Sequence, residues 1–101
     1  MAVLTNAVNS NKATELSGGT RLVSMYKLKM TTAADSIPLS ASTNGISTIT
    51  SVFASLWDKP SAAAANVAAS FSGLQVNLNA IEADGTAATV FPYVNLLVIG
   101  T

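Results

Sequence analysis

Hydrophobic and polar residues alternate along much of residues 20–101, a pattern that predicts β-strands. From Thr20 onwards, one face of the first predicted strand carries Leu22, Ser24, Tyr26, Leu28 and Met30, and the other carries Arg21, Val23, Met25, Lys27 and Lys29. We therefore expect the basic side chains of this strand on one side of the sheet and its larger hydrophobic side chains on the other.

Two further segments are predicted to be extended. A turn at 32–36 leads into Ile37–Leu39, which we expect at a sheet edge or outside the sheet because Pro38 cannot donate to a ladder. After the turn signal Asn44-Gly45, residues 46–57 are rich in β-branched residues. Their spacing also fits a helix weakly, but the many intervening Ser and Thr residues favour a strand.

The second half predicts a hairpin and a terminal strand. Two alternating runs flank Ser72-Gly73, which indicates a tight two-residue turn. A second turn is expected at 82–85. The nearly continuous apolar segment 89–99 is typical of a strand that is covered on both faces.

Residues 1–19 differ from the rest and predict an extended arm or a loosely attached first strand. A short helix around 13–16, stopped by Gly18 or Gly19, is the alternative. The predicted fold is all-β: a small antiparallel β-sandwich or partial barrel of about six strands, with a single β domain at 20–101 and an N-terminal arm at 1–19.

Composition narrows the function classes. The chain has no Cys and no His, which excludes thiolate nucleophiles, Ser-His-Asp triads and the usual zinc sites, so we expect no enzyme, no cofactor and no metal. Five basic and five acidic residues give zero net charge, and no run reaches the length of a membrane helix, so neither nucleic acid nor a membrane is expected as a partner. Ordinary soluble domains carry about 25% charged residues, whereas this chain has 10%. Scarce charge favours association with other subunits.

Two motifs with possible chemistry have simpler explanations. Ser24-x-x-Lys27 matches a penicillin-binding pattern, but a strand would place Ser24 and Lys27 on opposite faces. Glu82 and Asp84 could offer oxygen atoms to calcium, yet two carboxylates underfill its shell and Asp84-Gly85 is typical of a turn.

The aromatic and terminal apolar residues are the candidate binding residues. Core packing is expected for Phe53, Phe71 and Phe91. Trp57 stands at a strand end, where an interface is favoured over stacking on a sugar. The predicted interface residues are Val3, Leu4, Trp57, Tyr93, Leu97 and Ile99.

The chain resembles the small accessory virion proteins of tailed bacteriophages, on its short polar arm, its Ala/Ser/Thr-rich strands such as 27–39, and its hydrophobic terminal strand 94–101. The resemblance implies a capsid decoration (cement) protein: a homo-oligomer, with a trimer favoured, that binds the major capsid protein or another virion protein at the capsid surface of the virion. A tail- or fibre-associated module or a carbohydrate-binding β module is the alternative.

Overall fold

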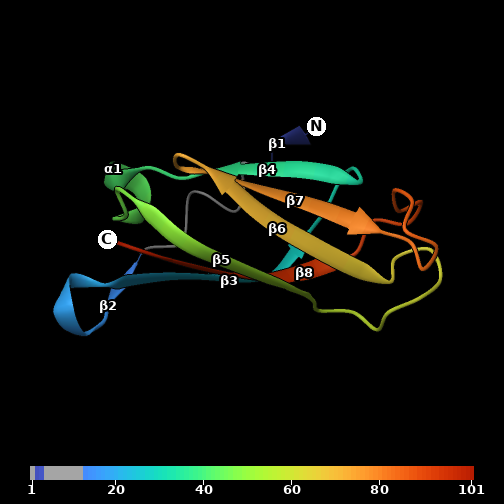
Figure 1. Ribbon diagram of the computed structural model, residues 1–101, viewed down its shortest axis with the longest axis horizontal. Helices are drawn as coiled ribbons and strands as arrows, with labels where there is room; N and C mark the ends of the chain where they lie inside the picture. The colour runs from blue at the N-terminus through green and yellow to red at the C-terminus, as the bar shows by residue number, and fades with distance from the viewer. Residues whose placement is uncertain (1, 4–12) are drawn as a thin grey trace.

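Two four-stranded sheets form the protein in a computed structural model that describes residues 2–3 and 13–101. The strand order is β1-β4-β7-β6 in one sheet and β2-β3-β8-β5 in the other, and the two sheets form two layers (Figure 1). The elements are β1 (Ala2–Val3), β2 (Thr14–Glu15), β3 (Arg21–Lys29), β4 (Ala34–Pro38), α1 (Ala41–Asn44), β5 (Ile49–Leu56), β6 (Asn66–Ser72), β7 (Gln75–Ile81) and β8 (Tyr93–Gly100).

The predicted all-β fold is confirmed. The six longer strands are β3 to β8, and every pairing among them is antiparallel. The segment 1–19 adds one two-residue strand to each sheet: β1 pairs with β4 in parallel, and β2 pairs with β3 in antiparallel. An attached strand, not a helix, therefore occupies 14–15, and the glycines follow it in a 3₁₀ turn at 17–19.

The core lies between the sheets and follows the strand period. Across the β2-β3-β8-β5 sheet, Val98 of β8 pairs with Val23 on one side and Val52 on the other. Ile37, Val76 and Leu78 of the other sheet, like Val23 and Val98, are fully buried. Alternation of this kind turns every second side chain toward the opposite sheet, which removes apolar area from water.

The predicted facing of β3 is wrong in its first half. Val23 and Met25 are the buried residues, while Leu22, Ser24 and Tyr26 point away from the core. A β-bulge between Met25 and Leu28 then shifts the register by one residue. Beyond it Leu28 packs against the core as expected.

The last strand is covered on one face, not on both. β8 begins at Tyr93, so 89–92 lie outside it. Val94, Leu96 and Val98 are buried, whereas the alternate residues Tyr93, Asn95, Leu97 and Ile99 are only partly buried. The continuous apolar sequence therefore exceeds what this core covers.

Segment 46–57 does form a strand, β5, but it is preceded by a single helical turn that the sequence pattern did not reveal. The Ser40 hydroxyl caps α1 by accepting a hydrogen bond from the Thr43 amide, and Gly45 ends it with φ of 77°. The Asn44-Gly45 signal therefore marks a helix C-terminus, where a left-handed residue is favoured, and not a β-turn.

Two turn predictions need correction. The first turn is shorter than 32–36, because β4 already begins at Ala34. β4 is bordered by β7 throughout and by β1 at Asp35 and Ser36, so within residues 2–3 and 13–101 it has a free edge only outside that pairing, where Pro38 lies. In the hairpin, Ser72 still pairs with Gln75, so the loop is Gly73-Leu74. The positive φ of Gly73 (59°) fits the first loop position of a type II′ turn.

A buried carboxylate fixes the connection between the sheets. Asp35 is fully buried, and its Oδ2 accepts hydrogen bonds from the backbone amides of Thr31 (2.8 Å) and Thr32 (3.4 Å). Its Oδ1 accepts from the Thr32 hydroxyl. These hydrogen bonds tie the backbone at Thr31 and Thr32 to the buried carboxylate, so Asp35 orders the turn that joins β3 to β4.

We expect Asp35→Ala to lower the free energy of unfolding by about 3 kcal/mol, because it removes a buried carboxylate that accepts charge-assisted hydrogen bonds from two backbone amides and a hydroxyl. Urea denaturation followed by circular dichroism measures this loss. Asp84→Ala makes the same chemical change in an exposed turn and is expected to cost much less. Equal losses in the two variants would contradict the structural role given to Asp35.

Candidate functional site

The side of the β2-β3-β8-β5 sheet that faces away from the other sheet is the candidate functional site, and we call it the outer face. Its rows follow from the register: Leu22, Ile99 and Ser51 form one row, and Ser24, Leu97 and Phe53 form the next. Asn95 and Ser55 make the third row, and Lys29 and Tyr93 make the fourth. Trp57 continues this last row, since its amide donates to the carbonyl of Tyr93.

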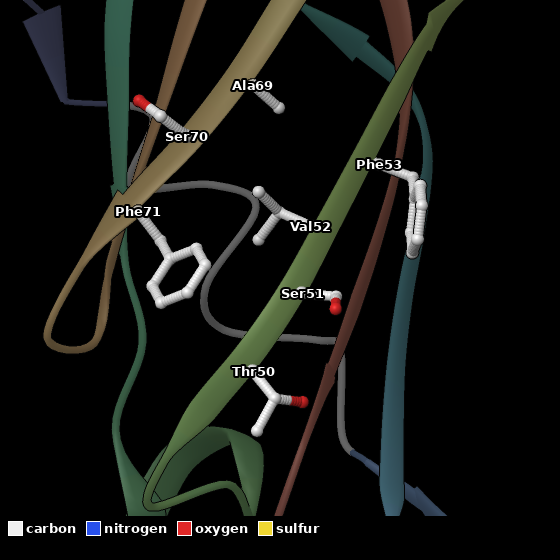
Figure 2. A pocket seen from close by; sticks show the side chains of 7 residues that line it. All are labelled: Thr50, Ser51, Val52, Phe53, Ala69, Ser70 and Phe71. Carbon is white, nitrogen blue, oxygen red and sulfur yellow. The ribbon is translucent and has the colours of Figure 1, made fainter.

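Aromatic side chains on this face are uncovered. Tyr26 is 74% exposed, Phe53 56% and Trp57 44%. The expectation that Phe53 packs in the core is therefore wrong: Figure 2 shows it on the opposite side of β5 from Val52, which lies toward β6. Large exposed apolar side chains that lie together on one face mark a surface that other molecules cover.

The other two phenylalanines lie off the outer face. Phe71 is 40% exposed at the end of β6, which contradicts the expected core position. Phe91 is partly buried and packs against the core, as predicted.

Four of the six predicted interface residues come together on the outer face: Trp57, Tyr93, Leu97 and Ile99. Val3 lies elsewhere, in β1, where it pairs with Ser36 of the other sheet. Leu4 falls outside the described residues. Sequence reasoning missed Tyr26, Phe53 and Asn95 as members of this face, because only the register of β3 and β5 against β8 reveals them.

The bulge in β3 decides what chemistry the outer face carries. Lys27 has φ of 58°, and its amide donates to the side-chain Oδ1 of Asn95 at 3.2 Å. Without this extra residue, Lys27 and Lys29 would turn toward the core and Leu28 would turn away from it. A buried, unpaired ammonium costs several kcal/mol, whereas a left-handed non-glycine residue costs about 1–3 kcal/mol. The bulge is therefore the less costly arrangement.

Lys27 in the bulge and Lys29 just after it both lie against the aromatic rings of the outer face. The Nζ of Lys27 lies 4.6 Å from the Trp57 ring centroid and 5.8 Å from that of Tyr93. The Nζ of Lys29 lies 5.0 Å from the Tyr93 centroid and donates to the carbonyl oxygen of Phe91. The Trp57 and Tyr93 rings meet edge to face, with centroids 5.8 Å apart. Lys27, Lys29, Trp57 and Tyr93 are called the cation–aromatic cluster below.

The predicted basic stripe is therefore rearranged. Arg21 lies apart from the two lysines, and its Nη1 donates to the Gly45 carbonyl oxygen at 2.6 Å. Tyr26, expected on the face opposite the lysines, shares the outer face with them. The expectation that Ser24 and Lys27 lie on opposite faces also fails, because the bulge turns Lys27 to the outer face, where Ser24 lies by regular alternation.

Two hollows border β5. One lies on the outer face, has a volume of about 350 Å³ and is lined by Ser24, Met25, Tyr26, Phe53, Ala54, Ser55, Asn95, Leu96 and Leu97. The other, of about 410 Å³, lies between β5 and β6, where Figure 2 shows Val52 and Phe71. Hydroxyl and apolar side chains line this second hollow, and none of its lining residues is charged.

The acidic turn has a local structural explanation. The Thr86 hydroxyl and, less strongly, the Thr86 amide donate to Asp84, and these bonds hold the pKa of the Asp84 carboxyl below its usual range. Such bonds are typical of an Asx turn. Within residues 2–3 and 13–101, no group of three or more acidic side chains is placed to hold a metal ion.

Comparisons with protein-family models, curated proteins and solved structures found no match. Among the described residues, no helix has the length and apolar character needed to cross a membrane. What the outer face binds must therefore be inferred from its own side chains.

The positive φ at Lys27 predicts which of two substitutions leaves the protein more stable. The free energy of unfolding of Lys27→Gly is expected to be about 1 kcal/mol higher than that of Lys27→Ala, because only glycine adopts positive φ without strain. Both variants remove the ammonium, so their difference reports the backbone alone.

Lys29 is the matched control, since it does not share the positive φ. There the Ala variant is expected to be the more stable, as in an ordinary strand. Urea denaturation of all four variants measures both differences. The same order at both positions would contradict the bulge.

Proposed function

We propose that the protein is a structural binding protein that attaches to a larger protein assembly through its outer face. The observation that carries this proposal is the exposure of Tyr26, Phe53 and Trp57 on one sheet face. Tryptophan and tyrosine are the residues that most often dominate binding energy at protein interfaces.

We further propose that the assembly is the capsid of a tailed bacteriophage and that the chain is a decoration (cement) protein. Its low charge and its many Ala, Ser and Thr residues support a protein that lies against neighbours. Small side chains lose little conformational entropy when a partner covers them. In this proposal the protein is located at the virion surface, has no catalytic role, and forms a homo-oligomer, with a trimer favoured.

A sheet face also suits this role mechanically. β8 is paired along both edges, with β3 and with β5, so its outward residues are held by ladders on either side. A partner that binds such a face has little backbone to order, which reduces the entropic cost of association.

A carbohydrate-binding module is the second candidate, favoured by one observation. Trp57 and Tyr93 lie together in the row next to Asn95, whose amide lines the outer-face hollow, and aromatic rings with amides are typical of sugar sites. Against it, Lys27 covers a face of the Trp57 ring. A sugar would have to displace that ammonium before it could stack there.

Mass spectrometry and cryo-electron microscopy of particles from the producing culture test the proposal. We expect a fixed number of copies per particle at the outer surface of the shell. Presence of the chain only in the particle-free fraction would count against a capsid role.

The outer face itself is tested by Phe53→Gln, which is expected to reduce attachment to particles at least ten-fold. Because Phe53 is exposed, the free energy of unfolding should change by only about 0.5 kcal/mol. Phe71→Gln is the matched control, with the same substitution at an exposed phenylalanine off the outer face. Equal attachment of both variants would show that the outer face is not the binding surface.

A further inference from the structure

We propose that the outer face binds an acidic peptide segment of its partner, with an apolar side chain in the outer-face hollow and carboxylates at the cation–aromatic cluster. This inference rests on the proposed binding function and names the chemistry of the partner. It follows from the unequal charge of the face, the shape of the hollow and the distance between the hollow and the lysines.

The two lysines of the outer face lack acidic partners among the described residues. All five acidic side chains of the chain lie within residues 13–101, and within that range neither Lys27 nor Lys29 forms an ion pair with any of them. Asp58, which follows Trp57, has a buried Oδ1 without a hydrogen-bond partner among the described residues, so this oxygen does not serve the lysines. The cation–aromatic cluster therefore presents two ammonium groups that no described carboxylate pairs with, which is complementary to an anionic partner.

The outer-face hollow has a largely apolar wall. Tyr26 of β3 and Phe53 of β5 flank it, and Leu97 lies between these strands. Its volume of about 350 Å³ and its largely apolar wall suit a single large apolar side chain. Asn95 and Ser55 lie on the side toward the cluster, where they can donate to the backbone of a bound segment.

The lysines lie at a fixed spacing from the hollow along β8. The Lys27 amide donates to Asn95, which is two residues from Leu97 beside the hollow, and Lys29 pairs with Tyr93, which is four residues or about 13 Å from Leu97. A bound peptide that lies along β8 in an extended form therefore needs its carboxylates two to four residues from its apolar anchor. This relation distinguishes an acidic segment from a generally negative surface.

A second copy of the outer face does not meet these requirements. Two outer faces placed together would put four ammonium groups into one interface without carboxylates to pair them, and like charges within an interface oppose binding. Asp35 is buried in the other sheet, Asp84 is held in its turn by Thr86, and Glu15 lies in β2, outside the cation–aromatic cluster. We therefore place the carboxylates on a different molecule.

An acidic polysaccharide would match the charge but not the rest. It has no apolar side chain for the hollow, and the ring faces that it would stack on are already approached by ammonium groups. A protein segment is therefore the better fit.

Synthetic pentapeptides test the inference through Trp57, the only tryptophan of the chain. The probe carries two glutamates separated by two serines from a phenylalanine, with blocked ends. The matched peptides replace either both glutamates by glutamine or the phenylalanine by serine. Trp57 fluorescence and amide shifts in NMR spectra measure binding to the full chain.

We expect the glutamate peptide to bind about ten-fold more tightly than either matched peptide and to weaken as salt is added. Lys27→Gln and Lys29→Gln should each weaken binding about three-fold. Lys59→Gln, which removes the same charge from an exposed lysine outside the cluster, should leave it unchanged.

Three results would overturn the inference: no perturbation at about 5 mM peptide, equal binding of the glutamine peptide, or tighter binding of polygalacturonate than of the glutamate peptide. The proposed function is judged separately. If Phe53→Gln loses attachment to particles while the Lys27→Gln/Lys29→Gln double variant retains it, the outer face binds particles but not through acidic segments.

Discussion

The outer face depends on one backbone irregularity, the bulge at Lys27. In an unbroken strand, Lys27 and Lys29 would lie on the same face as Val23 and Met25, and Leu28 and Met30 would lie on the opposite face. Such a strand would either bury both lysines or expose Val23 and Met25. Asn95 on the neighbouring strand stabilises the bulge by accepting the Lys27 amide hydrogen. The same residue faces outward, so the group that holds the backbone also borders the hollow. The core and the outer face are therefore set by a single register shift.

Much of the fold could be predicted from the sequence because period-two patterns are local. The six long strands, the hairpin after Ser72 and the strand nature of 49–56 all followed from spacing and turn residues. The facing of β3 could not be predicted from spacing in the same way, because the bulge between Met25 and Leu28 breaks the alternation. A signal was present: lysines need water, so Val23 and Lys29 could not share a buried face.

The candidate site was partly predictable for a different reason. The nearly continuous apolar segment 89–99 predicts a strand that is covered on both faces, and Tyr93, Leu97 and Ile99 lie on the face that the core leaves uncovered. Membership of Phe53 and Tyr26 depends on which residue of β8 each one neighbours. That register is long-range information, which neither spacing nor composition contains.

Hydroxyl-radical footprinting of the protein, free and attached to its particle, shows which surface the partner covers, because it measures the solvent exposure of individual side chains. We predict that Tyr26, Phe53 and Trp57 lose most of their labelling on attachment, while Phe71, which is exposed off the outer face, keeps its labelling. Protection of Phe71 with unchanged labelling of Tyr26, Phe53 and Trp57 would contradict the outer face as the binding surface.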